Sequence, residues 1–582
     1  MTAFDTSLSY AAGESQPPLL TQTIGTTLAA TTAKFPDSDA LIDAAVDRTW
    51  TYAGLRRDVI SLAAGLVRHG VTTGDRVALW APNRFEWVLT QFAAAEIGAI
   101  LVVLNPAYRR SEVAYALKQS GATLVLTAEK FRDAEYAVMI DDVRDQVPDL
   151  REVVVFESDT FAEMLTEPSS DEVTKVAELA AGLTDDDPIN IQYTSGTTGA
   201  PKGVTLTHRN IGNNGYMVGA LLDYTEADRI CLPVPFYHCF GMVMGNLAAI
   251  AFGATMVIPG PGFDPRDTLG AVEKYRCTSL YGVPTMFIAE LAALDAGAGS
   301  GASGPKVAGA GSGASGPSVA GAGSGASGPN VAGAEFDLSS LRTGIMAGSP
   351  CPEQVMRRVL DEMNMSQVSI CYGMTETSPV STQTRMDDDV DLRVATVGRV
   401  GPHLEIKIID PVTGETLPRG ETGEFCTRGY SVMKGYWKDP AKTAEVLSEE
   451  GWMRTGDLGV MGDDGYVRIT GRIKDLVIRG GENIYPREVE EFLYTHPDII
   501  DAQVIGVPDE KYGEELMAWI QLREGASPLT VDDVRAFATG HIARHKIPRY
   551  VHVVDEFPMT VTGKVRKVEM RAQSIEFLGL SK

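Results

Sequence analysis

The feature that most constrains the fold is an alternation of short apolar runs with helical segments, which begins at Arg76. Arg76–Trp80 and residues 99–104 have the pattern of strands, and Phe85–Ile97 between them has that of a helix. The alternation continues through Leu124–Thr127 and residues 152–156. Apolar strands separated by helices are typical of parallel β-α-β units. The sequence therefore predicts an α/β protein with parallel or mixed β-sheets layered with helices.

The C-terminal part of the chain has a different pattern. With 582 residues, the chain is several times longer than the ~100 to 200 residues of one domain. Beyond a glycine-rich, charged segment near Gly471, the sequence predicts a helix at 486–495, strands at 502–507 and 516–522, a helix at 531–543 and a final strand. This is a compact α+β unit of about domain size. We place the boundary at residues 472–474, which gives a large N-terminal domain (1–471) and a small C-terminal domain (472–582).

A repeat interrupts the larger part. Residues 296–331 are three consecutive copies of a twelve-residue unit, AGAGSGASGPKV, AGAGSGASGPSV and AGAGSGASGPNV. Each copy holds one valine, which is too little apolar surface to offset the entropy of ordering a solenoid. We interpret 296–334 as a flexible surface insert that follows a helix ending near Leu294. Such an insert lengthens a loop at little cost, and we expect it to be dispensable for the chemistry.

Composition and charge exclude several classes of protein. The formal net charge of −26 argues against nucleic acid or an anionic membrane as the main partner, because both require a basic face. No apolar run reaches the ~18 residues of a membrane span, and the first residues lack the pattern of a secretory signal. We therefore expect a cytoplasmic protein with no integral membrane segment. The six cysteines show no metal-ligand spacing, so we expect reduced, mostly buried thiols.

The stretch YTSGTTGAPKG, residues 193–203, has the composition of a phosphate-binding loop. Glycines let backbone N–H groups approach a polyphosphate, hydroxyl groups add donors, and a lysine adds a positive charge. It is not a Walker A motif, because the glycine spacing differs and a glycine follows the lysine. The candidate ligand-binding residues here are Thr194, Ser195, Gly196, Thr197, Thr198 and Lys202.

This stretch resembles the phosphate-loop signature of the acyl-adenylate-forming superfamily, which includes acyl-CoA synthetases, firefly luciferase and nonribosomal peptide adenylation domains. Further stretches resemble the superfamily's other signatures in the same order, over nearly the whole chain outside the N-terminus and the repeat. The sequences PFYHCFG, IMAGSPCP, SVMKGYW and IRGGENIYPREVE are most similar to those of medium-chain acyl-CoA synthetases. The resemblance implies that ATP, Mg²⁺ and coenzyme A take part.

The stretch YGMTE, residues 372–376, resembles the second nucleotide motif of the superfamily. The resemblance implies that Tyr372, followed by Gly373, stacks on adenine, that Thr375 contacts the α-phosphate and that Glu376 helps to hold Mg²⁺. A cation held by a carboxylate suits the reaction, because it neutralises the leaving pyrophosphate. Taken alone, a Thr-Glu pair is more typical of a helix cap.

Two further stretches resemble nucleotide and hinge positions. The resemblance implies that Asp457, in the sequence TGDL, accepts hydrogen bonds from the ribose hydroxyls, although an isolated Gly-Asp pair is typical of a turn. It also implies that Arg472 contacts the nucleotide and that Lys474 is the hinge about which the C-terminal domain moves. Without the resemblance, this charged segment has the pattern of a solvated linker.

Near the C-terminus, PMTVTGK resembles the motif of the mobile catalytic lysine. Lys564 would then bridge the substrate carboxylate and the α-phosphate and stabilise the negative charge that develops during attack. A single lysine near the end of a chain is otherwise surface charge.

Three regions concern the acyl group and the thiol. The resemblance implies that His238 lies at the mouth of the acyl pocket, although it also fits a structural histidine, and that residues 282–285 with Gly348 and Ser349 line the walls. It implies that Gly481 lines the pantetheine tunnel, where the missing side chain leaves room for a slender arm.

The resemblance thus implies an AMP-forming fatty acid–CoA ligase whose mobile C-terminal domain serves two half-reactions in turn. An acyl-AMP ligase that loads a carrier protein stays open as an alternative, as does a catalytically dead nucleotide- or acyl-binding sensor. The sequence does not decide between alkyl and aryl acids. It leaves the oligomeric state open as well, with a homodimer among the options.

Overall fold

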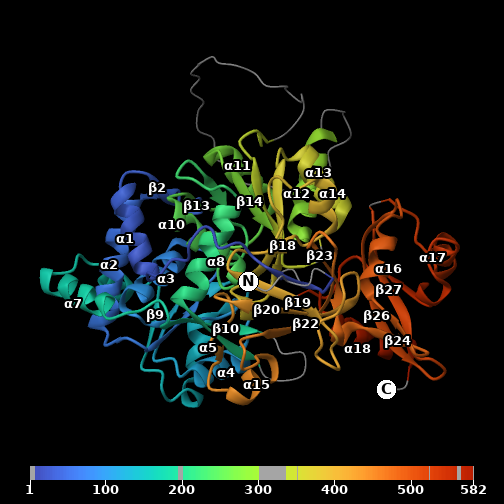
Figure 1. Cartoon of the computed structure of the whole chain (residues 1–582). Helices are drawn as coiled ribbons and strands as arrows, with labels where there is room; N and C mark the ends of the chain where they lie inside the picture. Colours follow the sequence, from blue (N-terminus) through green and yellow to red (C-terminus); the bar gives the residue numbers. More distant parts are fainter. Residues whose placement is uncertain are drawn as a thin grey trace.

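The computed structural model describes residues 7–194, 201–299, 336–349, 351–523, 525–559 and 565–580. Two large β-sheets form the central part of the molecule, and helices pack around them (Figure 1). Within the described ranges, no helix has both the length and the apolar character needed to cross a membrane. The predicted class, α/β with mixed sheets layered by helices, is confirmed.

The first large sheet has seven strands, and the predicted alternation builds its parallel part. Its strands, in spatial order, are β21 (Gly435–Tyr436), β11 (Lys202–Thr207), β10 (Pro188–Thr194), β5 (Ile100–Val103), β4 (Arg76–Trp80), β6 (Leu124–Thr127) and β9 (Glu152–Val155). The strands from β10 to β9 are parallel to one another, whereas β11 and β21 are added antiparallel. The carboxyl ends of the parallel strands therefore lie at one edge.

The second large sheet has nine strands and carries the remaining parallel units. Its strands, in spatial order, are β18 (Arg399–Val400), β17 (Val380–Gln383), β16 (Gln367–Gly373), β15 (Thr343–Ala347), β14 (Ser279–Gly282), β12 (Arg229–Cys231), β13 (Thr255–Ile258), β2 (Asp39–Asp43) and β3 (Arg48–Thr51). The strands from β16 to β2 are parallel, so the carboxyl ends of β14, β15 and β16 are neighbours.

Helix α3 (Phe85–Ile97) shows why a continuous apolar segment becomes a central helix. All residues from Glu86 to Ile97 are buried, which is the pattern of a helix covered on every side. Its two acidic residues are compensated, because Arg84 pairs with Glu86 at 2.7 Å and Arg56 pairs with Glu96. The predicted bounds of this helix are confirmed.

Several further helices are labelled in Figure 1. They are α2 (Tyr52–Arg68), α8 (His208–Leu221), α10 (Ala248–Phe252), α11 (Pro265–Tyr275), α12 (Pro284–Gly299), α13 (Glu353–Glu362), α16 (Pro486–Leu493), α17 (Val531–Ala538) and α18 (Lys567–Leu578).

Two smaller sheets follow in the sequence. A five-stranded antiparallel sheet contains β1 (Tyr10–Ala12), β19 (Leu404–Ile409), β20 (Thr422–Gly429), β22 (Met453–Met461) and β23 (Val467–Arg472). A second five-stranded sheet contains β24 (Val477–Arg479), β25 (Glu482–Ile484), β26 (Ile499–Asp509), β27 (Gly513–Leu522) and β28 (Tyr550–Val553).

The second of these sheets packs with α16 and α17 in one apolar cluster and with α18 in another, and these elements lie together at one side of the larger part in Figure 1. The predicted boundary at 472–474 falls on the short connection between β23 and β24. The division into two domains, the smaller one mobile, stays a prediction.

Three helices end at other residues than the sequence predicts. Helix α16 ends at Leu493 instead of residue 495, with Tyr494 as its C-cap. Helix α12 runs to Gly299 instead of ending near Leu294, so the first residues of the predicted insert are helical. Helix α17 ends at Ala538 instead of residue 543, since Gly540 adopts a left-handed φ of 87° that an α-helix does not accommodate. The rest of the repeat insert lies outside the described residues.

Candidate functional site

The phosphate-loop sequence connects two paired strands. β10 ends at Thr194 and β11 begins at Lys202, and these two residues are opposite each other in an antiparallel pair. Thr194 and Lys202 are both half-buried. Ser195, Gly196, Thr197 and Thr198, which the sequence also predicts as ligand-binding residues, lie outside the described residues.

Lys202 begins a polar chain that leads to Glu376. Its Nζ lies 3.3 Å from the hydroxyl of Tyr436 on β21 and 4.5 Å from the centre of that ring. The Tyr436 hydroxyl donates in turn to Oε1 of Glu376 at 2.9 Å. Tyr436 is held beside Lys202 because β21 pairs with β11. The chain brings the phosphate-loop lysine and the predicted metal ligand to one place.

Glu376 is a buried carboxylate in a short 3₁₀ turn, η3 (Thr375–Thr377), and only 4% of its surface is exposed. Burial raises its pKa, and the hydrogen bond from Tyr436 and the charge of Lys202 oppose that rise. A bound cation would act in the same sense as Lys202 and stabilise the ionised form. Thr375, its neighbour in the turn, is also buried.

A second polar cluster joins Tyr372, Asp457 and Arg472. Tyr372, near the end of β16, donates its hydroxyl to Oδ2 of Asp457 at 2.8 Å. Arg472 Nε lies 3.0 Å from Oδ1 of the same carboxylate, because β22 and β23 place these two residues opposite each other. Burial raises the pKa of Tyr372, and the charge of Asp457 raises it further and also raises the pKa of Arg472.

These three side chains have the functional groups that bind a nucleotide. The cluster combines an aromatic face, a carboxylate that accepts hydrogen bonds from hydroxyl groups, and a guanidinium group for a phosphate. Gly373, the next residue after Tyr372, is tightly packed: a Cβ atom there would lie 1.7 Å from the carbonyl oxygen of Pro379. Any larger residue would displace the strand end that carries Tyr372.

His238 caps the short helix α9 (Cys239–Gly241). Its Nδ1 accepts the backbone N–H of Phe240 at 3.1 Å, and the ring is half-buried. The thiol of Cys239 donates to Oε1 of Gln192 at 3.2 Å, and Gln192 stands two residues before Thr194 on β10. The turn that carries His238 is therefore fixed to the strand that leads into the phosphate loop.

Gly348 and Ser349 follow the carboxyl end of β15. Gly348 is exposed and has a φ of 92°. A Cβ atom there would lie 3.1 Å from Val283 and 4.0 Å from the ring of Phe240. Gly348 thus faces the His238 turn, and Ser349 beside it is half-buried.

Lys474 and Gly481 follow Arg472 in the chain. Lys474 is exposed in the 3₁₀ turn η4 (Ile473–Asp475). Gly481 lies with Gly480 in the two-residue hairpin between β24 and β25, with φ values of 91° and 61°, as a type I′ turn requires. No described atom lies within 4 Å of the position of a Gly481 Cβ. Lys564 lies outside the described residues.

Sequence reasoning missed Tyr436 and Gln192. Tyr436 stands in the SVMKGYW stretch that supports the resemblance, but its contact with Glu376 depends on strand pairing far along the chain. Gln192 has an ordinary strand sequence around it, and its link to Cys239 gives no signal in the sequence.

Comparisons with known proteins agree with this geometry. The family described as AMP-binding enzyme matches residues 28–437, and the AMP-binding enzyme C-terminal domain matches residues 488–564. The chain is 45% identical to "Putative acyl-CoA synthetase YngI" of Bacillus subtilis (strain 168), over 97% of this chain and 99% of the relative. It is 41% identical to "Medium-chain acyl-CoA ligase ACSF2, mitochondrial" of Danio rerio, over 98% of this chain and 91% of the relative.

A solved structure shows the same fold. The anthranilate CoA ligase AuaEII, in complex with anthranoyl-AMP, superimposes with a TM-score of 0.81 at 24% identity, over 97% of this chain and 99% of that one. Together, the two matched family regions and the full-length relatives assign the chain: it belongs to the AMP-binding enzyme family, in its acyl-CoA synthetase branch.

Proposed function

We propose that the chain is an AMP-forming fatty acid–CoA ligase that prefers medium-chain acids. In the first half-reaction the acid's carboxylate oxygen attacks the α-phosphorus of ATP, and pyrophosphate leaves to give an acyl-adenylate. In the second, the thiol of coenzyme A attacks the acyl carbonyl carbon, so that a thioester forms and AMP leaves. The medium-chain preference is supported by the name of the Danio rerio relative.

The observation that carries the proposal is the pair of polar clusters. Tyr372, Asp457 and Arg472 are suited to a nucleoside, with the ribose hydroxyls donating to Asp457. Lys202 and Glu376, joined through Tyr436, are suited to the phosphates. Thr375, next to Glu376 in the buried turn, would reach the α-phosphate.

Glu376 is also the residue that would hold Mg²⁺. Among the described residues, no group of three or more His, Cys, Asp or Glu side chains could hold a metal by itself. This fits Mg²⁺, which is commonly bound by one or two carboxylates together with substrate phosphates and water. When bound, the ion would neutralise the charge of the leaving pyrophosphate.

His238, Gly348 and Ser349 would border the acyl group. Gly348 faces the turn that His238 caps, so a carboxylate held near Thr375 could continue as an alkyl chain between them. This assignment rests on Gly348 and Thr375 following the carboxyl ends of the neighbouring strands β15 and β16, and on the closeness of Gly348 to the ring of Phe240 in the His238 turn.

Lys564 would stabilise the charge that develops on the α-phosphate during acyl-adenylate formation. Gly481, in its open hairpin turn, would admit the pantetheine arm after the C-terminal domain turns about Lys474. The cytoplasmic location and the homodimer stay predictions.

The test is the conversion of ATP to AMP and pyrophosphate by the purified full chain with Mg²⁺, over short to long fatty acids and aryl acids, with and without coenzyme A. We expect sustained AMP release that requires both a medium-chain acid and coenzyme A. Pyrophosphate exchange that depends on the acid but not on coenzyme A would point to a carrier protein as acceptor. The absence of turnover with every acid would contradict the proposal and favour a sensor.

A further inference from the structure

Gln192, on β10, is a buried polar residue that stands two residues before Thr194, the end of that strand. Only 2% of its surface is exposed. Its amide contacts two sulfur-containing side chains from a later part of the chain. The thiol of Cys239 donates to Oε1 at 3.2 Å, and Nε2 donates to Sδ of Met242 at 2.9 Å. One side chain therefore joins the strand that leads into the phosphate loop to the segment that follows His238.

The chemistry of the two partners fixes the orientation of this amide. The thioether of Met242 can only accept a hydrogen bond, so Nε2 faces it, and Oε1 then faces the thiol of Cys239. Burial raises the pKa of that thiol, and the charge of Glu376 raises it further, so the thiol stays protonated and keeps its donor. Cys239 is 0% exposed and Met242 is 1% exposed. Because these groups are shielded from water, losing one of the bonds leaves a buried polar group without a partner.

The segment on the other side of this link has a second anchor. Met242 begins a π-helix, η2 (Met242–Leu247), that directly follows the short helix capped by His238. Such segments are frequent at functional sites. Gln91, on α3, donates through Nε2 to the carbonyl oxygen of Met242 at 3.1 Å, and its Oε1 accepts from Nδ2 of Asn246 at 2.9 Å. The segment is thus held between α3 and β10 by two buried glutamines.

We propose that Gln192 is a positioning residue for acid activation: its two hydrogen bonds fix the His238 turn relative to the end of β10, so that the acid's carboxylate meets the α-phosphate. This inference rests on the proposed function. The acid would lie along the His238 turn and the phosphates on the loop after β10, so two different elements hold the reacting atoms. Attack requires these atoms about 3 to 3.5 Å apart, and a misplacement of about 1 Å can slow a reaction about 10²-fold. Without the Gln192 bonds each substrate still binds, but their relative position is no longer fixed.

The test measures pyrophosphate release in a single turnover by the full chain, at saturating ATP, Mg²⁺ and acid, together with the Kd for ATP in the absence of acid. Gln192→Met fills the space of the side chain without its amide. We expect this variant to release pyrophosphate about 10- to 100-fold more slowly while the Kd for ATP changes less than about threefold, because orientation matters in the transition state and not in binding. A Kd for ATP that rises as far as the rate falls would overturn the inference, since Gln192 would then act in nucleotide binding.

Cys239→Ser and Cys239→Ala separate the hydrogen bond from the packing. Serine keeps a donor for Oε1 of Gln192, whereas alanine removes it. We expect Cys239→Ala to slow pyrophosphate release about fivefold more than Cys239→Ser does. Adding Cys239→Ala to Gln192→Met should cause little further loss, because both changes remove the same bond. Should Gln192→Met not fold, equal rates in the two Cys239 variants would overturn the inference by themselves.

Asn190→Leu is the matched control, since Asn190 stands on the same strand and is 1% exposed, but its amide donates to the carbonyl oxygen of Leu101 on β5 at 3.0 Å. It should lower the melting temperature and leave the rate per folded molecule unchanged. If Asn190→Leu slowed pyrophosphate release as strongly as Gln192→Met, the effect would belong to the strand as a whole, and the inference would fail while the ligase stood. A wild-type protein that activates no acid would instead refute the proposed function.

Discussion

Glu290, on α12, is a buried carboxylic acid that the candidate site does not use. It is 0% exposed, and neither oxygen has a hydrogen-bond partner within the part of the chain that the structure describes. Burial raises its pKa well above the ordinary value. The folded protein therefore keeps the group protonated at a pH where the unfolded chain has already ionised. Its contribution to stability is fully present below the ordinary pKa and is lost as pH rises towards the folded-state value.

We expect Glu290→Gln to remove this pH dependence. The difference in melting temperature between the variant and the wild type should rise in favour of the variant by on the order of 2 °C or more from pH 5 to pH 8. Glu96→Gln serves as control, because Glu96 is also buried but pairs with Arg56, so its loss should lower the melting temperature. A difference between Glu290→Gln and wild type that stays constant with pH would show that Glu290 does not titrate in this way.

Tyr436 connects Lys202 with Glu376 through its hydroxyl, which accepts a hydrogen bond from Lys202 and donates one to Glu376. We expect Tyr436→Phe to lower the rate of pyrophosphate release about tenfold, because a hydrogen bond to a charged group is lost. The Mg²⁺ concentration for half-maximal rate should rise as well. Tyr136→Phe is the control, since that hydroxyl donates to the backbone carbonyl of Pro106 and to no residue of the two clusters. An unchanged Mg²⁺ dependence would contradict the role given to Tyr436.

Residues of the two clusters could be predicted from the sequence where each belongs to a distinctive sequence motif. Lys202, Glu376 and Asp457 belong to such stretches. Tyr436 and Gln192 could not be named, because their contacts arise from strand pairing and from a helix cap far along the chain. Glu290 gives no signal either, since a glutamate on a predicted helix is ordinarily placed at the surface.

At the scale of elements, the sequence predicts β-α-β units well where the hydrophobic period is regular. The bounds of α3, β4 and β6 agree with the prediction. The π-helix η2 (Met242–Leu247) could not be predicted from the sequence. Its hydrophobic residues show no periodicity that would distinguish a π-helix from an α-helix. The number and order of the strands in the nine-stranded sheet could not be predicted either, since they depend on contacts between distant segments of the chain.

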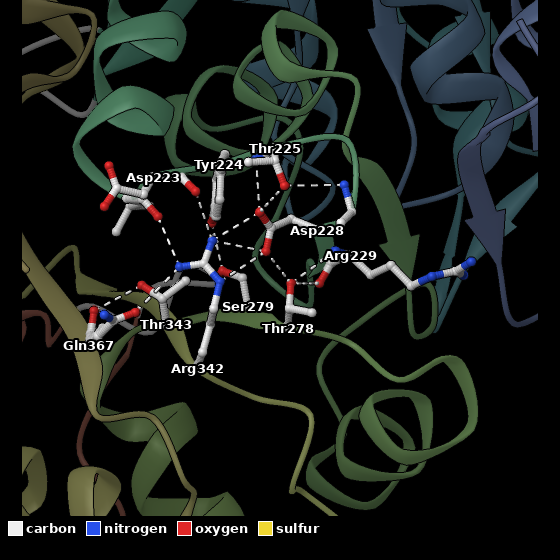
Figure 2. A network of polar contacts seen from close by, with 12 residues as sticks. Asp223, Tyr224, Thr225, Asp228, Arg229, Thr278, Ser279, Arg342, Thr343 and Gln367 are labelled. Carbon is white, nitrogen blue, oxygen red and sulfur yellow. Dashed lines mark hydrogen bonds and ion pairs between the residues drawn. The ribbon is translucent and has the colours of Figure 1, made fainter. Parts of the chain in front are cut away.

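An ion pair joins the amino ends of β12 and β15, two parallel strands of that sheet (Figure 2). Arg342, just before β15, contacts both carboxylate oxygens of Asp228, just before β12, at 2.9 and 3.0 Å. Asp228 is 3% exposed and also accepts from the hydroxyl of Thr278 at 2.7 Å. Since the carboxyl ends carry the candidate site, this network supports the opposite edge of the sheet.

We expect Asp228→Ala to lower the free energy of unfolding by about 2 to 4 kcal/mol, because it leaves a partly buried guanidinium group unpaired. Denaturant unfolding measures this change. Asp337→Ala breaks the exposed pair with Arg276 and should cost less than about 1 kcal/mol. Activity per folded molecule should be the same in both variants. Equal stability losses in the two variants would show that the Asp228 network is no more than a surface pair.

At the scale of the whole molecule, the C-terminal part must serve two chemical steps with different residues. Lys564 and Gly481 both lie beyond residue 474, whereas the nucleotide clusters lie before it. Because one active site cannot hold the catalytic lysine and the thiol tunnel in the same place, the proposed function requires the C-terminal domain to turn between the half-reactions.

Lys564→Ala and Gly481→Leu should therefore separate the two steps. We expect Lys564→Ala to slow pyrophosphate release about 10²- to 10³-fold, the usual cost of an electrostatic donor in the transition state. Gly481→Leu should keep acid-dependent pyrophosphate release in a single turnover and block thioester formation, because a side chain fills the path of the thiol arm. Gly414→Leu controls for backbone strain, since Gly414 has a similar φ of 76° and open surroundings in a remote turn. If Gly481→Leu slowed both half-reactions equally, or Gly414→Leu blocked thioester formation as strongly, the tunnel would lie elsewhere, and the requirement for a turning domain would lose its support.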